Sequence, residues 1–169
     1  ITAHEGNYDL ILQATLEFVT KNSIWLPNCY DDFLIKPLDV QKKHDVGFCG
    51  NINNRGGLIN ALQEKFNFKL DEFVIGDAMV QAINSYKVHF NANIGIDINY
   101  RNFETMGCGT CLLTSQNPHL SELGMLDGVN CLVYSNVEEM INKAKKALED
   151  DEFRARIGKA GNRLAKLHT

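Results

Sequence analysis

Short apolar runs alternate along the chain with longer segments whose apolar residues recur every three or four positions. The short runs predict β-strands, and the longer segments predict amphipathic helices. The predicted strands are 45–51, 72–77, 88–93, 110–115 and 131–135. The predicted helices are 52–66, 78–87, 100–109, 136–150 and 151–169, with a further short helix in the loop 117–130. Because strands separated by helices form parallel sheets covered on both faces, we expect a doubly wound α/β domain.

Two of these helices have further local support. The apolar residues of 52–66 share one helical face: Leu58, Ile59, Leu62 and Phe66. In the segment 136–150, Asn136 is a favourable N-cap, and Glu138 and Glu139 place negative charge in the first turn. The spacing supports the first helix, and the second is predicted to begin at Asn136.

The first 44 residues do not follow the same alternation. Residues 9–13 and 23–27 are short apolar runs on either side of a possible helix at 14–22. The segment 28–44 contains Pro37 and acidic pairs but no clean period, which is typical of a linker.

This difference predicts two parts. Residues 1–38 are expected to be the tail of a preceding N-terminal domain with its linker, and residues 39–169 to be one α/β domain. The lack of an initiator methionine suggests that the chain is a fragment.

Composition narrows the function classes. A net charge of −4 disfavours a broad nucleic-acid surface but leaves room for a local phosphate site. The five cysteines are odd in number and mostly lie in apolar runs, which predicts reduced core residues of a cytoplasmic protein. No apolar run reaches the ~18 residues of a membrane span, and the first residues lack the features of a signal peptide.

Candidate binding residues follow the first predicted strand of the domain. Ligands of open α/β sheets bind at the carboxyl ends of strands, and the stretch FCGNINNRGG is such an end. Gly50 permits close backbone approach, Asn51 starts a polar turn, and Arg55 lies at the start of the next helix. Helix-start amides and a guanidinium suit a diphosphate, although neither the dinucleotide nor the P-loop pattern is present. An ordinary polar turn with a solvated arginine is the alternative.

A second candidate lies in the stretch NYRNFETMGCGTCLLTS, Asn99 to Ser115. Glu104 is expected in the first turn of the helix, where it could accept hydrogen bonds from a ribose diol, with Arg101 near the phosphates. Favourable placement of a carboxylate at a helix N-terminus explains Glu104 equally well.

Other reactive side chains carry weaker patterns. Cys108 and Cys111 are spaced like a redox dithiol, but they close a helix and enter a strand, the opposite of the arrangement that activates such thiols. No cysteine or histidine pairs have zinc-ligand spacing. His89 lies inside a predicted strand and is expected to be a core residue, whereas His119 could reach the ligand end of the sheet.

Several stretches, taken in order, resemble the C-terminal half of GT-B glycosyltransferases. They are WLPNCYDD, HDVGFCGNINNRGGLINAL, NYRNFETMGCGTCLLTS, LDGVNCLVYSNVEEMINKAKKALEDDEFRARIGKAG and LHT. The resemblance extends from about Trp25 to the end of the chain. Within that class the sequence is most similar to a family-1-like group that includes spore-maturation-protein-like enzymes.

The resemblance implies a Rossmann-like domain that binds a nucleotide sugar. It matches Arg55 to a phosphate contact and Glu104 to the glutamate that holds the ribose. The loop that lines the sugar and diphosphate matches Asn99, Tyr100, Arg101 and Asn102. Residues implied near the base are Gly76, Asp77 and 91–93.

One departure concerns the donor sugar. Many retaining members have a second glutamate, separated from the first by seven residues, and that position here is Ile96, with Asp97 next to it. The choice between retention and inversion therefore stays open, as do the catalytic residues.

The resemblance implies transfer of a sugar from a nucleotide-diphosphate sugar to a hydroxyl of a glycan, lipid or protein. It implies no cofactor beyond that donor, no metal, no nucleic-acid partner and no integral membrane segment. The alternatives are a non-catalytic nucleotide- or glycan-binding module and a GT-B-like nucleotide-sugar epimerase.

Overall fold

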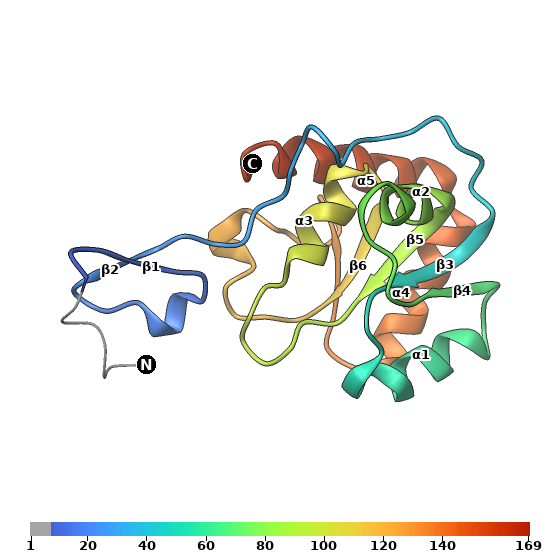
Figure 1. Cartoon of the computed structure of the whole chain (residues 1–169). Helices are drawn as coiled ribbons and strands as arrows, with labels where there is room; N and C mark the ends of the chain where they lie inside the picture. Colours follow the sequence, from blue (N-terminus) through green and yellow to red (C-terminus); the bar gives the residue numbers. More distant parts are fainter. Residues whose placement is uncertain (1–7) are drawn as a thin grey trace.

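A five-stranded parallel sheet forms the centre of the structure. The computed structural model describes residues 8–169 (Figure 1). The strands of this sheet are β3 (His44–Cys49), β4 (Phe68–Asp71), β5 (Tyr86–Asn91), β6 (Cys111–Ser115) and β7 (Leu132–Tyr134). The α-helices are α1 (Gly56–Gln63), α2 (Gly76–Ser85), α3 (Tyr100–Gly107), α4 (Val137–Glu149) and α5 (Asp151–Ala165).

The strand order is β4-β3-β5-β6-β7, and every neighbouring pair is parallel. From β3 the chain first runs outward to β4, then returns to the other side of β3 as β5 and continues to β7. The order therefore reverses between β3 and β5, and a crevice forms at such a switch point, at the carboxyl ends of the strands.

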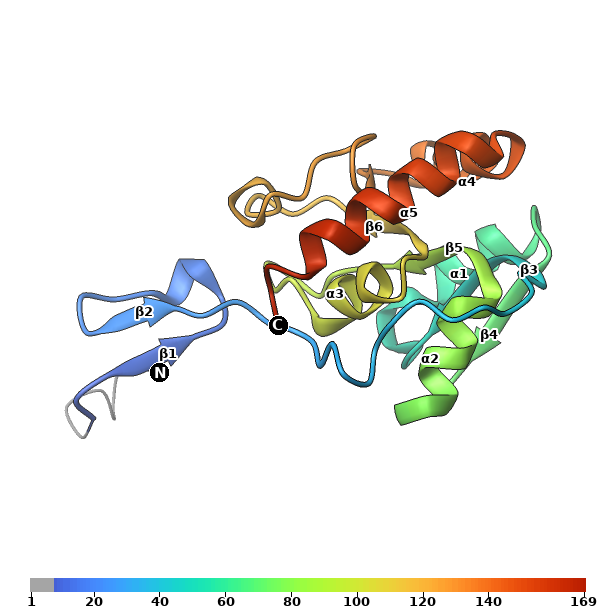
Figure 2. The same ribbon diagram turned by 90° about the horizontal axis from the view of Figure 1, so that it is seen from above.

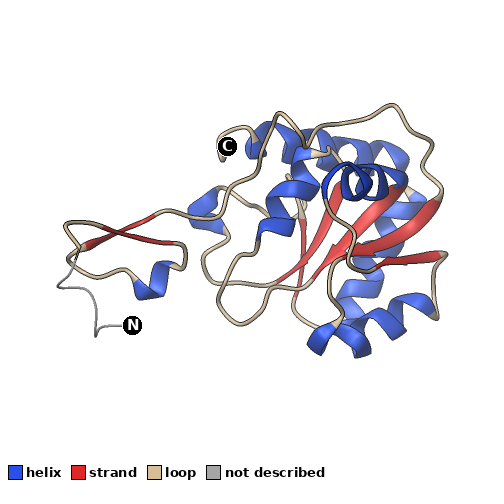
Figure 3. Cartoon of the chain, viewed as in Figure 1, coloured by secondary structure: helices blue, strands red, loops and turns tan. Residues whose placement is uncertain are grey.

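Helices cover both faces of the sheet (Figure 3). Buried residues of α2 and α3 form one core with one face of the sheet, and buried residues of α1 and α4 form the other core with the opposite face. Helix α5 contributes to both, through Ile157 on one side and Ala165 on the other. The doubly wound α/β fold expected from the sequence is confirmed.

Four of the five expected strands are present, and the second was misplaced. The strand is Phe68–Asp71 rather than 72–77. β4 is at the edge of the sheet, where a strand needs fewer apolar residues than a central one, so its sequence alternates weakly. The more apolar run that follows is on the surface, with Phe73 and Ile75 about 80% exposed (81% and 80%).

Capping side chains set the boundaries of the last two helices. Asn136 Oδ1 accepts the Glu139 amide at 2.9 Å, which confirms the expected cap of α4. Asp150 ends α4 and caps α5, its carboxylate accepting the Phe153 amide at 2.8 Å. One residue thus serves both helix ends and fixes the turn between them.

Helix α5 packs unusually close to the neighbouring backbone. A Cβ on Gly158 would fall on the carbonyl oxygen of Gly109, and one on Gly161 would lie 2.7 Å from the carbonyl oxygen of Asn130. Glycine at these two positions is what allows α5 to lie against the turn after α3 and the segment before β7.

The N-terminal part forms a separate small sheet. Strands β1 (Ile11–Gln13) and β2 (Ser23–Trp25) pair in parallel and lie beyond the α3 end of the domain in both views (Figures 1 and 2). The helix expected at 14–22 is reduced to a 3₁₀ turn, Leu16–Phe18. Residues 14–22 must connect two parallel neighbours, which leaves little length for a full helix.

The segment expected to be a linker packs against the domain. Tyr30 and Ile35 are buried in the core that contains α2 and α3. The Asn28 side chain donates to the Ile98 carbonyl at 2.8 Å, and the Leu38 amide donates to Asn84 Oδ1 at 2.9 Å. The proposed boundary between residues 38 and 39 stays a prediction.

None of the helices within residues 8–169 combines the length and apolar character needed to cross a membrane.

We predict that Gly158→Ala lowers the free energy of unfolding by ~1–3 kcal/mol, because the added methyl group meets rigid backbone. Gly57→Ala is the matched control: Gly57 is also helical, has no atom within 4 Å of a built Cβ, and should gain up to ~1 kcal/mol from higher helix propensity. Guanidinium denaturation measures both. Equal stability of Gly158→Ala and the wild type would contradict the packing described for α5.

Candidate functional site

A pocket of about 390 Å³ opens at the carboxyl ends of β3 and β5, beside the start of α3. It lies at the switch point of the sheet. Seven of the nine residues expected to bind a ligand line it: Gly50, Asn51, Asn99, Tyr100, Arg101, Glu104 and Arg55. The two stretches singled out in the sequence therefore meet in one pocket.

The turn after β3 brings backbone and a cation to the pocket. The Gly50 amide donates to the Asp71 carbonyl at 3.0 Å, which keeps the end of β3 beside β4. Asn51 Oδ1 accepts the Asn53 amide at 3.1 Å and reverses the chain into a 3₁₀ turn, Asn53–Arg55, that continues into α1. Arg55 ends that turn at the rim of the pocket.

Arg55 is held by backbone oxygens rather than by a carboxylate. Its Nε and Nη2 donate to the Ala92 carbonyl at 3.0 and 2.8 Å, and Nη1 donates to the Asn51 carbonyl at 3.1 Å. The guanidinium lies 5.8 Å from the centre of the Phe48 ring. No acidic group of residues 8–169 lies within 4.0 Å of it, so its charge is not neutralised by a protein partner.

Two of the five N–H groups of Arg55 are left for a ligand. Partial burial lowers the pKa of Arg55 from its ordinary value, because burial disfavours the charged form. The interpretation of Arg55 as a freely solvated arginine does not hold, since its side chain is fixed on two carbonyls and an aromatic ring.

Helix α3 supplies an ion pair. Arg101 Nη1 lies 2.8 Å from Glu104 Oε2, and the two side chains are only 19% and 18% exposed. Burial raises the pKa of Glu104 and the Arg101 charge opposes that rise. Arg101 also contacts the sulfur of Met79 on α2.

The position of Glu104 differs from the expected one. Asn99 is the N-cap residue of α3 and the helix begins at Tyr100, so Glu104 is its fifth residue rather than a first-turn residue. The helix dipole acts mainly on the first turn. Helix capping therefore does not explain Glu104, and its partner is Arg101.

Asn102 lies in the interior instead of on the pocket. Its side chain has no exposed surface. Its Nδ2 donates to Asn93 Oδ1 at 2.8 Å and its Oδ1 accepts from Thr114 Oγ1 at 2.7 Å and from Asn91 Nδ2 at 3.0 Å. It joins the ends of β5 and β6 to α3 and supports the pocket from behind.

Gly76 also lies outside the pocket. It begins α2 with φ of 60°, a conformation suited to glycine. The structure thus brings seven of the expected residues together and gives Asn102 and Gly76 structural positions.

A histidine that the sequence could assign only to the core connects the two halves of the site. His89 is fully buried, and its Nε2 accepts the Cys49 amide at 3.1 Å. Its Nδ1 lies 2.6 Å from Thr105 Oγ1, which donates to the Arg101 carbonyl at 2.6 Å. The hydrogen bonds require the neutral ring with the proton on Nδ1. His89 therefore links the end of β3 to the first turn of α3.

The CGTC stretch is structural. Cys108 and Cys111 are buried, and burial raises the pKa of each thiol to about 12. The thiolate is the reactive form, so burial and the raised pKa values both speak against the redox interpretation. All five cysteines are free, and four of them are buried as expected.

Comparison with known proteins identifies the family. A family model described as "Glycosyl transferase-like" matches residues 32–169. The chain belongs to this glycosyl transferase-like family. No curated protein sequence matches the chain, and the family model leaves the spore-maturation-like subgroup a prediction.

Solved structures show that this glycosyl transferase-like chain has the Rossmann-like fold of the C-terminal half of GT-B enzymes. Sucrose-phosphate synthase from Thermosynechococcus elongatus matches with a TM-score of 0.77 and 12% identity, over 95% of this chain and 54% of that one. HepE from Anabaena, in complex with UDP and glucose, matches with a TM-score of 0.74 and 14% identity, over 95% of this chain and 59% of HepE. The C-terminal domain of the group 1 glycosyl transferase LpcC from Francisella tularensis matches with a TM-score of 0.64 and 10% identity, over 82% of this chain and 97% of that domain. The chain thus spans just over half the length of the first two structures.

We predict that the His89 link makes stability depend on pH. Burial holds the pKa of His89 well below the usual 6.5, so only the unfolded chain takes up this proton as the pH falls below about 6.5. The free energy of unfolding should decrease toward pH 5.5, with a His89 contribution of up to ~1.4 kcal/mol per pH unit. In His89→Gln that contribution disappears. Denaturant titrations between pH 7.5 and 5.5 compare the two slopes, and identical slopes would show that His89 is not a buried neutral ring.

We also predict that Asn102→Ala costs at least ~2 kcal/mol of stability, because the buried partners Asn91, Asn93 and Thr114 lose hydrogen bonds. Asn142→Ala, an exposed asparagine of α4, is the matched control and should be close to neutral. Thermal or chemical denaturation measures the stability of both variants against the wild type. A fully stable Asn102→Ala protein would mean that the asparagine cluster does not support the pocket.

Proposed function

We propose that this domain binds the nucleoside diphosphate of a nucleotide sugar in the pocket between β3 and α3. The observation that carries the proposal is the convergence of Arg55, Arg101 and the Gly50 backbone on one pocket that also contains the partly buried carboxylate of Glu104. A diphosphate needs donors and positive charge, and a ribose diol needs an acceptor. The pocket offers both within one volume.

The free N–H groups of Arg55 are suited to a phosphate oxygen. Since the guanidinium is fixed by the Ala92 and Asn51 carbonyls, it does not have to be reoriented on binding. The Gly50–Asn51 backbone lines the same pocket and has no bulky side chain at Gly50 to keep a phosphate away. Arg101, whose charge is paired with Glu104, brings a second guanidinium to the pocket from α3.

Glu104 is proposed to accept hydrogen bonds from the ribose hydroxyls. Its pair with Arg101 favours the ionised carboxylate, which is acceptor-only, against the effect of burial. Arg101 would therefore both orient Glu104 and contribute charge near the diphosphate.

We further propose that the domain acts in transfer of the sugar to an acceptor hydroxyl, in the cytoplasm, with the acceptor bound by the other half of a two-domain enzyme. When the bond from the sugar to the diphosphate breaks, negative charge grows on the leaving oxygen. Arg55 and Arg101 would stabilise that charge in the transition state more than in the ground state. The family membership and the free cysteines support this assignment.

Uridine is the first base to test. The structure of HepE contains UDP and glucose, and that of pneumococcal GtfA contains UDP and GlcNAc. Both proteins share the fold with this chain.

We predict that the protein binds UDP more tightly than 2′-deoxy-UDP by roughly tenfold or more, because Glu104 accepts a hydrogen bond from the 2′-hydroxyl. Glu104→Ala should weaken UDP binding and remove the preference between the two nucleotides. Arg55→Ala should weaken both nucleotides equally, since its partner is a phosphate. Isothermal titration calorimetry measures the affinity of the wild type and of both variants for UDP and for 2′-deoxy-UDP.

The control for these variants is Arg163→Ala, which removes an exposed arginine of α5 away from the pocket. Unchanged UDP affinity in both Arg55→Ala and Glu104→Ala would rule out the proposed site. Product analysis after incubation with UDP-GlcNAc then distinguishes transfer to an acceptor from epimerisation and from binding alone.

A further inference from the structure

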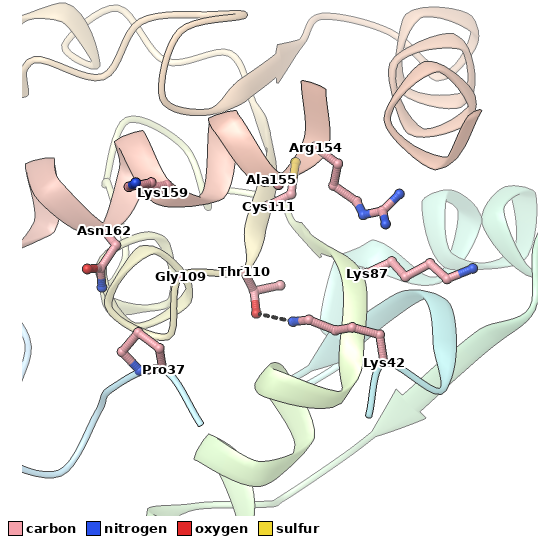
Figure 4. Close-up of a pocket in the computed structure, with 10 residues that line it drawn as sticks. All are labelled: Pro37, Lys42, Lys87, Gly109, Thr110, Cys111, Arg154, Ala155, Lys159 and Asn162. Atoms are coloured by element: carbon pink, nitrogen blue, oxygen red, sulfur yellow. Dashed lines mark hydrogen bonds between the residues drawn. The ribbon is translucent and has the colours of Figure 1, made fainter. Parts of the chain in front are cut away.

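A second pocket, of about 400 Å³, lies at the amino ends of the strands, where β5 and β6 begin (Figure 4). Its wall includes Thr110 and Cys111 at the start of β6, Lys87 at the start of β5, and one flank of α5. It shares no lining residue with the pocket at the carboxyl ends of the strands. The two pockets are therefore separate.

The wall of this second pocket is positively charged. It contains four cationic side chains and no acidic one: Lys42, Lys87, Arg154 and Lys159. This is unexpected in a chain whose net charge is −4. The pocket is thus a local exception to the charge of the whole protein.

Two of the four cations already have protein partners. Lys87 pairs with Asp45 at 2.7 Å, and Arg154 pairs with Asp151 at 2.6 Å and donates to the Ala147 carbonyl at 2.8 Å. Across residues 8–169, no carboxylate lies within 4.0 Å of the other two ammonium groups. Counting Asp45 and Asp151 against the four cations leaves two positive charges, those of Lys42 and Lys159.

Lys42 is directed into the pocket. Although the residue as a whole is exposed, its ammonium turns inward and donates to the buried Thr110 hydroxyl at 3.1 Å (Figure 4). Thr110 Oγ1 in turn donates to the Ile83 carbonyl at 2.9 Å, so its lone pair is oriented toward Lys42. Two of the three N–H groups of Lys42 have no partner among the described side chains and backbone.

The Lys42 ammonium has lost part of its hydration without gaining an anion. Burial lowers its pKa to about 8, and the nearby Arg154 charge acts in the same direction. An anion in the pocket would compensate that cost, because an opposite charge favours the protonated ammonium. The geometry and the charge balance thus point to the same kind of occupant.

We propose that this pocket is a binding site for a phosphate-bearing ligand, held by Lys42, with Lys159, Lys87 and Arg154 adding longer-range attraction. A phosphate monoester carries a charge of about −1.5 to −2, close to the local excess of two positive charges, and offers three acceptor oxygens. The volume is in the range of small-ligand sites. The phosphate belongs either to a free small molecule or to the headgroup of a lipid.

Inorganic pyrophosphate is the probe for the free ligand, and amide NMR of the labelled protein locates it. We expect saturable shifts of the Gly109, Thr110 and Cys111 amides. Lys42→Gln should weaken the binding measured at these amides by roughly tenfold, and Lys159→Gln should weaken it less, because its ammonium attracts the phosphate from a longer distance. Lys145→Gln, an exposed lysine of α4 whose side chain is 64% exposed, is the matched control and should bind as the wild type does.

Vesicles of phosphatidylcholine with and without phosphatidic acid form the second arm. Binding only to vesicles that contain phosphatidic acid, lost in Lys42→Gln, would assign the phosphate to a lipid headgroup. The proposal is overturned if the three amides do not respond to pyrophosphate and the vesicles do not bind, or if binding is the same in Lys42→Gln and in the wild type. Shifts at Gly50 and Asn51 report the other pocket and are followed separately in the same spectra.

Discussion

The packing of Tyr86 across three neighbouring strands is the constraint on which the site depends. The ring lies over Gly47 of β3, where a Cβ would fall on the ring atoms, and its hydroxyl donates to Asp71 of β4. The same ring stacks on His89 with centroids 5.6 Å apart and an interplanar angle of 13°. Glycine at position 47 thus lets one aromatic side chain fix β4, β3 and β5 together.

His89 connects these strands to the residues that line the pocket. Because β3 and β5 pair in parallel with Gly47 opposite His89, the imidazole reaches the Cys49 amide just before Gly50. Its second nitrogen contacts Thr105 on α3, one helical turn after Arg101. The strand tip and the helix that line the pocket are therefore positioned by one buried, neutral ring. A preorganised site of this kind spends less binding free energy on ordering its own groups.

The sequence was sufficient for the fold and for the approximate location of the site. Local patterns placed four of the five strands, the Asn136 cap, and the two polar stretches that meet in the pocket. Prediction from the sequence failed where tertiary packing determines the role of a residue or the position of a strand. The edge strand β4 needs little apolar surface, so the more apolar exposed run at 72–77 was mistaken for it. Asn102 and Glu104 lie two residues apart on one helix, and only their packing makes one a buried support and the other a partner of Arg101. A lone histidine in a strand, such as His89, has no pattern that reveals its two hydrogen bonds.

The central claim is that the pocket between β3 and α3 holds a nucleoside diphosphate, and a crystal structure of the protein with UDP tests it most directly. The account predicts the diphosphate beside Arg55 and the Gly50–Asn51 backbone, with the ribose hydroxyls within hydrogen-bond distance of the Glu104 carboxylate. UDP bound elsewhere on the domain, or a pocket that stays empty at saturating UDP, would contradict the account.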